Sequence, residues 1–162
     1  MRVTCHNGLV KPTLALVVLA VVSVGTASCG ADGSGGEPPY LPMVSIRGEG
    51  PQASYKGTLL GYYKEVTYEG SPTRDESRPV AAARGEDLRI ELRTAAAESL
   101  TVLAVSESDE DRIVRAEVSG SGRNWRAQLP EALPQDSYLK VSAFLEDYPG
   151  AIHAWDIALT MP

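Results

Sequence analysis

The sequence predicts an all-β fold, an antiparallel sandwich of about seven to eight short strands that follows a signal peptide and a flexible linker. Three observations support this fold class. Apolar and polar residues alternate along several short runs, and glycine, proline and small polar residues interrupt these runs at short intervals. Helix-forming residues gather only at 81–83 and 95–98, where each stretch is too short for more than one helical turn.

The chain divides into three parts. Residues 1–28 have the basic start, apolar run and small final residues of a secretory signal peptide. The apolar run, residues 14–24, is much shorter than the roughly 20 residues of a membrane-spanning helix, so removal of this segment is expected. Residues 29–39 are rich in glycine and end in two prolines, which predicts a flexible linker, and residues 40–162 form the sandwich domain.

Small residues precede a cysteine at the end of the signal peptide, in the order Thr26, Ala27, Ser28 and Cys29. This run resembles the lipobox of bacterial lipoproteins, although Thr26 stands where that family usually has leucine. The resemblance implies cleavage after Ser28 and a diacylglyceryl group on Cys29, which would hold the protein at the extracytoplasmic face of the cell membrane. An ordinary signal peptide that is cleaved near a cysteine is the alternative.

The net charge limits the classes of partner that the protein can bind, and the cysteine content limits the disulfides that it can form. Loss of Arg2 and Lys11 with the signal peptide would take the net charge from −6 to −8, which argues against a nucleic-acid partner. The chain has two cysteines. Since Cys5 would be removed and Cys29 acylated, the domain would contain no disulfide and would depend on core packing.

The alternation is clearest in residues 88–93, where Leu88, Ile90 and Leu92 are separated by charged residues. A period of two places these three side chains on the buried face of a sheet whose other face meets solvent. The other predicted strands are residues 43–47, 58–68, 100–106, 113–118, 124–129, 138–145 and 151–159.

The second half of the domain carries a family resemblance. Residues 124–129 form a predicted strand that contains Trp125, residues 130–134 form a proline-containing crossover, and Tyr138 opens the next alternating strand. Residues 88–159 thereby resemble the small immunoglobulin-like domains of bacterial envelopes. The resemblance implies an immunoglobulin-like β-sandwich, here without the paired cysteines of antibody domains.

Motifs for catalysis are missing from the sequence. There is no G-x-S-x-G elbow and no phosphate-binding P-loop, and the glycines of residues 48–53 are expected to form a loop since Pro51 and the following residues do not open a helix. We therefore expect no enzymatic activity and no cofactor. A small extracytoplasmic hydrolase that uses scattered carboxylates or His153 is the less favoured alternative.

A metal-binding module is a further alternative. Carboxylates cluster at residues 109–111 and 146–147, both in predicted loops, where several oxygens could hold calcium. His153 with Met43 or Met161 offers the imidazole and thioether ligands that suit copper. Neither set has the spacing of a known metal motif, and solvated acidic turns are the favoured explanation of the carboxylates.

Tyrosines provide the predicted binding surface. Four of the chain's seven tyrosines lie within residues 55–68. If residues 58–68 form one strand, Tyr62, Lys64 and Tyr68 share a face, on which they would contact a protein or glycan partner. The alternative is that the tyrosines cover an edge of the sandwich. The sequence thus predicts a noncatalytic envelope lipoprotein that binds a protein or an extracellular polymer.

Overall fold

The computed structural model describes residues 39–162, which form twelve β-strands. The predicted signal peptide, Cys29 and the linker up to residue 38 lie outside the described residues. Within the described residues there is no helix, and hence none that is long and apolar enough to cross a bilayer. The all-β prediction is therefore confirmed. The strands are β1 (Met43–Arg47), β2 (Ala53–Lys56), β3 (Thr58–Tyr63), β4 (Val66–Tyr68), β5 (Val80–Ala81), β6 (Asp87–Leu92), β7 (Ala97–Ser106), β8 (Ile113–Arg115), β9 (Glu117–Ser121), β10 (Asn124–Gln128), β11 (Ser137–Leu145) and β12 (Ala151–Thr160).

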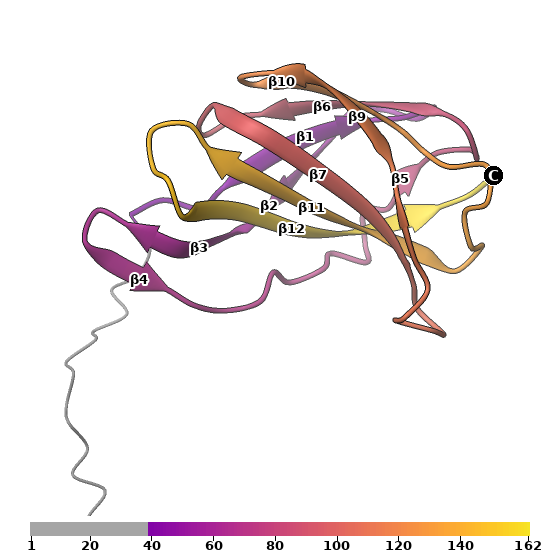
Figure 1. The fold of residues 1–162 in the computed structure, drawn as a ribbon. Helices are drawn as coiled ribbons and strands as arrows, with labels where there is room; N and C mark the ends of the chain where they lie inside the picture. Colours follow the sequence, from indigo (N-terminus) through magenta and orange to yellow (C-terminus); the bar gives the residue numbers. More distant parts are fainter. Residues whose placement is uncertain (1–38) are drawn as a thin grey trace, which may run out of the picture. The chain divides into compact units, whose positions relative to one another are not determined.

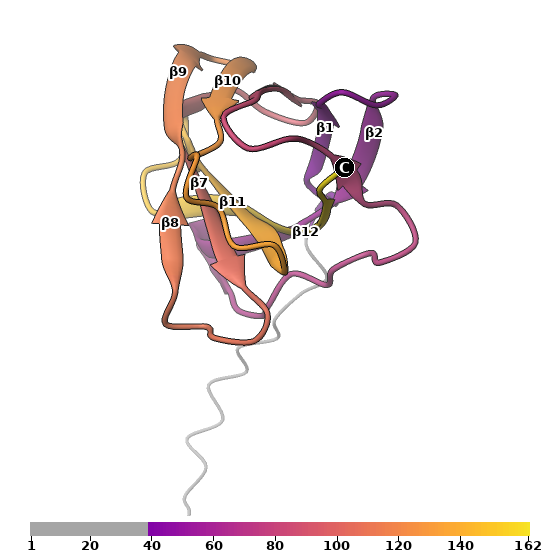
Figure 2. The same ribbon diagram turned by 90° about the vertical axis from the view of Figure 1, so that its right-hand side faces the viewer.

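The strands form two sheets that face each other in a sandwich-like arrangement (Figures 1 and 2). The five-stranded sheet has the order β2-β1-β6-β10-β9. The seven-stranded sheet has the order β4-β3-β12-β11-β7-β8, and β5 also pairs with β12. Every pairing is antiparallel except that of β5 with β12.

The main hydrophobic core lies between the two sheets. In β6 the side chains of Leu88, Ile90 and Leu92 are at most 2% exposed, as the alternation predicts. The facing strands β11 and β12 contribute Leu139 and Trp155 to the same cluster. Since one side chain in two points inward, each sheet keeps a second face for solvent.

A second, smaller core lies where β3 and β4 meet the ends of β11 and β12. We call it the aromatic end. Leu59, Tyr63, Leu145 and Ala151 are buried there, and Tyr40, Tyr68, Ala95 and Tyr148 pack around them. The Tyr63 and Tyr148 ring centroids are 4.1 Å apart, and the Tyr40 ring meets Tyr63 edge-on at 5.7 Å. The tyrosines of this region therefore act mainly as packing residues.

The prediction of one strand over residues 58–68 is wrong. The chain forms the hairpin β3–β4, whose turn contains Lys64 and Glu65 with φ angles of 47° and 67°. Positive φ at both central residues is the geometry of a tight hairpin turn, which glycine and asparagine usually occupy. Lysine and glutamate are not typical of such a turn, so the sequence does not predict it.

The prediction of one strand over residues 113–118 is also wrong, because the chain changes sheets there. β8 pairs with β7 in the seven-stranded sheet, and β9 pairs with β10 in the five-stranded sheet. Ala116 lies between them, buried, and its N–H donates to the Val102 carbonyl at 3.0 Å. The small side chain of Ala116 lets the chain pass from one layer to the other without leaving the core.

Two strands were not predicted. β2 is only four residues long, and β5 is a two-residue strand next to the predicted helical turn at residues 81–83. Neither that stretch nor residues 95–98 is helical, and β7 already begins at Ala97. With these two additional strands and the two predicted strands that are each divided, the number of strands is twelve instead of the expected seven or eight.

Replacement of Gly61 by alanine is expected to lower the free energy of unfolding by about 2 kcal/mol. Gly61 has a φ of +83°, and an added Cβ would collide with the carbonyl oxygen of Gly150, which accepts a hydrogen bond from the Tyr62 N–H. Gly50→Ala is the matched control, because its Cβ would meet only the Ala81 Cβ, at 3.5 Å. Equal urea denaturation midpoints for the two variants would contradict the prediction.

Candidate functional site

Three arginines form a row across the outer face of the five-stranded sheet. Arg47 on β1 lies opposite Arg89 on β6, and Arg89 lies opposite Arg126 on β10. Neighbouring strands are about 4.8 Å apart, so the backbone positions of Arg47 and Arg126 are separated by about 10 Å. We call these three residues the arginine row.

The arginine row follows from the alternation that builds the core. Arg89 stands between the inward-facing residues Leu88 and Ile90, and Arg126 stands between the buried residues Trp125 and Ala127. All three arginines are exposed. Sequence reasoning missed the row. Alternation indicates that each arginine points outward, but only the strand order and the register bring residues so far apart in the chain side by side.

The arginine row lines an open groove of about 570 Å³. Its other polar side chains come from five strands or their ends: Ser45, Gln52, Glu91, Ser119 and Asn124. The groove therefore combines guanidinium groups with amides and hydroxyls, all of which can donate hydrogen bonds. Such a surface suits a ligand that carries negative charge and many oxygen atoms.

The arginine row forms no ion pair within residues 39–162, although Asp87 lines a smaller depression beside it together with Arg47 and Arg89. None of the three guanidinium groups has an ion pair within 4.0 Å among these residues. Glu91, the acidic residue in the groove, lies instead 3.4 Å from Arg93 Nε and accepts a hydrogen bond from Gln52 at 3.4 Å. Like charges directly opposite each other destabilise a sheet, so the row is expected to lower the stability of the domain.

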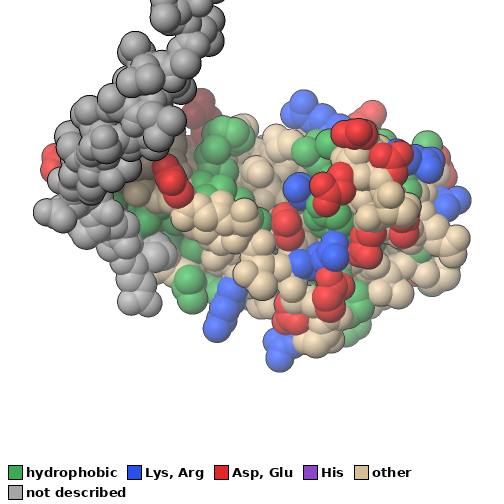
Figure 3. Space-filling view, turned by 90° about the horizontal axis from the view of Figure 1, so that it is seen from below, with side chains coloured by type: hydrophobic (Ala, Val, Ile, Leu, Met, Phe, Trp, Pro, Cys, Tyr) green, Lys and Arg blue, Asp and Glu red, His purple; other side chains and the backbone are tan. Residues whose placement is uncertain are grey.

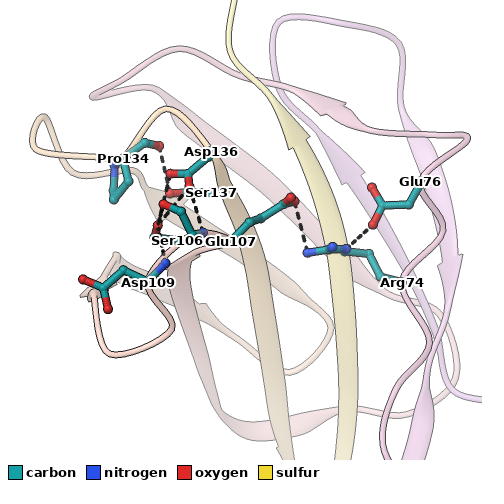
Figure 4. A network of polar contacts seen from close by, with 9 residues as sticks. Arg74, Glu76, Ser106, Glu107, Asp109, Pro134, Asp136 and Ser137 are labelled. Atoms are coloured by element: carbon teal, nitrogen blue, oxygen red, sulfur yellow. Dashed lines mark hydrogen bonds and ion pairs between the residues drawn. The ribbon is translucent and has the colours of Figure 1, made fainter.

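The opposite face of the domain has a different charge arrangement. Acidic and basic side chains lie interspersed on the face that Figure 3 presents. Figure 4 shows one such group, in which Arg74 pairs with both Glu76 and Glu107. The Arg74 guanidinium also lies over the Tyr138 ring, 4.4 Å from its centroid. The charge of Arg74 is therefore compensated locally.

The acidic loop that was a calcium candidate is held by a polar network (Figure 4). Asp136 accepts hydrogen bonds from the Ser106 hydroxyl at 3.1 Å and from the Ser108 N–H at 2.9 Å. Hydrogen bonds from Ser108, and then from Ser106, hold the pKa of the Asp136 carboxyl below its usual value. Residues 109–111 are exposed at the tip of this loop, and no three His, Cys, Asp or Glu side chains converge as metal ligands anywhere in residues 39–162.

His153, the candidate for hydrolysis or copper binding, lies buried at the aromatic end. Its Nε2 is 3.0 Å from the Tyr40 hydroxyl, and its ring meets those of Tyr40 and Trp155 edge-on. Burial lowers the pKa of His153 to about 4. Met161 follows the far end of β12, eight residues away and therefore about 27 Å along an extended strand, so it is not a neighbour of His153.

The three residues of the predicted tyrosine surface do not share one face. Tyr62 is 54% exposed and pairs with Thr67, whereas Tyr68 pairs with Gly61 and its ring lies against Tyr63. Lys64 is exposed in the turn. The hairpin thus places Tyr68 on the inner side, in the aromatic end, and leaves Tyr62 and Lys64 accessible. Contact of a partner with these residues stays a prediction.

The fold and the groove together define an all-β, sandwich-like domain with a positively charged row on one polar sheet face. No family model, curated protein or solved structure matches the chain. Function is therefore inferred from the geometry and charges of residues 39–162 and from the motif around Cys29.

Proposed function

We propose that this chain is a noncatalytic lipoprotein, held at the extracytoplasmic face of the cell membrane through Cys29, whose sandwich domain binds an extracellular polymer or a protein. The small residues before Cys29 and the glycine-rich segment after it support the anchor and the spacer. The acidic domain would be repelled by anionic lipid, so a lipid tether rather than surface charge would keep it at the membrane.

The observation that carries the binding proposal is the groove over the arginine row. It is an open depression of about 570 Å³ on a sheet face, lined mostly by polar side chains, of which the three arginines, Gln52, Ser119 and Asn124 are exposed. An open groove can accept a ligand that extends beyond both of its ends, as a polymer or a peptide segment does. Three aligned arginines without an ion pair among residues 39–162 supply an attraction for anionic groups, whereas the charge of Arg74 is paired with Glu76 and Glu107.

We also propose that the sandwich is of the immunoglobulin-like type, and the strand order supports this. The order β1-β6-β10-β9 corresponds to the A-B-E-D sheet of that fold, and β12-β11-β7 corresponds to its G-F-C sheet, with β8 beside β7. The hairpin β3–β4 and strand β2 would then be an insertion between the first two standard strands. β5 runs parallel to β12 after this insertion.

Fractionation of cells that express the full chain tests the anchor. Wild-type protein is expected in the membrane fraction, with an acylated Cys29 at the amino terminus in mass spectrometry. Cys29→Ala is expected to lose the acyl group and leave the membrane fraction. Cys5→Ala is the matched control, because Cys5 lies within the predicted signal peptide. Equal membrane association of the two variants would overturn the anchor.

Co-sedimentation with insoluble envelope material tests the binding function. The purified full-length protein in detergent is expected to sediment with this material, and Arg89→Gln is expected to sediment less. Tyr62→Ala examines the predicted tyrosine surface separately, because Tyr62 lies on the hairpin β3–β4 in the other sheet. Failure of the wild-type protein to sediment would overturn the binding function, whatever the fate of the anchor.

A further inference from the structure

We propose that the arginine row binds an acidic polysaccharide whose sugar units carry carboxylates, with the sugar chain lying across the strands. This inference rests on the proposed binding function and names the chemical class of its ligand. Guanidinium groups bind carboxylates with two parallel hydrogen bonds, which makes arginine well suited to this recognition.

The spacing of the arginine row lets one ligand chain contact all three side chains. Successive arginines lie on neighbouring strands, so their backbones are about 4.8 Å apart. A chain that lies across the strands can therefore bring several carboxylates within reach of Arg47, Arg89 and Arg126. The amides and hydroxyls that line the groove beside the row favour a sugar chain over a peptide, because a sugar chain carries many hydroxyl groups.

The side chains beside the row fit the remaining groups of such a polymer. Gln52, Asn124 and Ser119 line the groove together with the arginines. Their amides and hydroxyls can donate and accept hydrogen bonds, as sugar hydroxyls require. The side chains of Gln52 and Asn124 are exposed, and Ser119 follows Arg126 in the same cross-strand row. A polymer lying along the row would pass directly over Ser119.

The charge arrangement supports an anionic ligand independently of the spacing. The arginine row places three positive side chains directly opposite each other, without an ion pair among residues 39–162. Bound carboxylates would remove this repulsion. The row is found in a domain whose predicted net charge is negative, so a polyanion would be attracted to this face and repelled by much of the remaining surface.

Equilibrium dialysis of the purified full-length protein in detergent against a labelled hexagalacturonate tests the proposal. Saturable binding that weakens as salt concentration rises is expected. Arg89→Gln, which changes the central arginine, is expected to weaken binding by about tenfold or more, because one of the three charged contacts with the ligand is lost. Arg115→Gln is the matched control, because Arg115 is exposed on β8 in the other sheet and its loss changes the net charge equally.

Four outcomes would overturn the proposal. They are the absence of saturable binding to wild-type protein, undiminished binding to Arg89→Gln, equal binding of the fully methyl-esterified hexasaccharide, and tighter binding of hexa-aspartate or of polyphosphate. The last outcome would assign the groove to a different polyanion. Co-sedimentation with envelope material that persists while hexagalacturonate fails to bind would leave the binding function intact and overturn only the ligand class.

Thermal unfolding of the same variants separates a binding role from a structural one. Because Arg89 faces two like charges and no ion-pair partner within residues 39–162, the unfolding midpoint of Arg89→Gln is expected to equal or exceed that of the wild type. A lowered midpoint together with weakened binding would indicate that Arg89 supports the fold, and would overturn its assignment as a ligand contact.

Discussion

Replacement of Trp155 by alanine is expected to lower the free energy of unfolding by about 4 kcal/mol. The indole is 1% exposed in the main core, and its N–H faces the Pro42 carbonyl oxygen at 3.4 Å. Gly57 lies directly against the ring, where any larger residue would collide with it. The backbone on that side cannot easily collapse into the space that alanine would leave. Urea denaturation followed by circular dichroism measures the change.

Trp155→Phe is the control for this prediction. It keeps an aromatic ring in the core and loses the bicyclic volume and the N–H group, so its cost is expected to be about 1 to 2 kcal/mol. Because folded proteins are stable by only about 5 to 15 kcal/mol, the alanine variant would be close to the limit of folding. An alanine variant within 1 kcal/mol of the wild type would contradict the packing described for Trp155.

Lowering the pH from 6.5 to 4 is expected to remove about 3 kcal/mol of stability through His153. Burial lowers the pKa of His153 from 6.5 to about 4 in the folded protein. In this range the unfolded chain therefore binds a proton that the folded chain does not bind. The contribution of neutral His153 is complete above pH 6.5, and it falls as the pH drops toward 4.

His153→Gln isolates this effect, because glutamine keeps a polar partner for Tyr40 and does not titrate. Carboxylates also change protonation near pH 4, but they do so in both proteins. The free energy of unfolding, measured by urea denaturation at several pH values, is expected to decline more steeply between pH 6.5 and 4 in the wild type. Parallel curves for the two proteins would show that His153 accepts a proton in the folded state.

Much of the fold was predictable because it depends on local patterns. The inward positions Leu88, Ile90 and Leu92 follow from alternation alone, and the ends of β1 agree with the predicted residues 43–47. The turn that divides residues 58–68 into two strands could not be predicted in this way. The β3–β4 turn uses Lys64 and Glu65 in a conformation that tertiary pairing enforces, so their identity gave no indication of it.

The candidate site was harder to predict than the fold, because it depends on pairing between distant strands. Arg47, Arg89 and Arg126 are unremarkable singly, since each is a polar residue in an alternating strand. Their alignment requires the order β1-β6-β10 and a specific register, neither of which periodicity determines. The expectation that Tyr62, Lys64 and Tyr68 share one face was wrong because the unforeseen turn places Tyr68 on the opposite side of the hairpin from Tyr62.

Strand β1 has a mechanical consequence for a tethered protein. The chain enters β1 from Tyr40 and Pro42. The Tyr40 hydroxyl contacts His153 on β12, and the Pro42 carbonyl accepts hydrogen bonds from the Gly57 N–H and the Trp155 indole N–H. β1 also carries Arg47 and is flanked by β2 and β6 on both sides. Tension between a membrane tether and a ligand on the arginine row would run along this strand. The part of the load that passes to Arg89 and Arg126 would shear the ladder between β1 and β6 along its length, a geometry that resists extraction better than opening one bond after another.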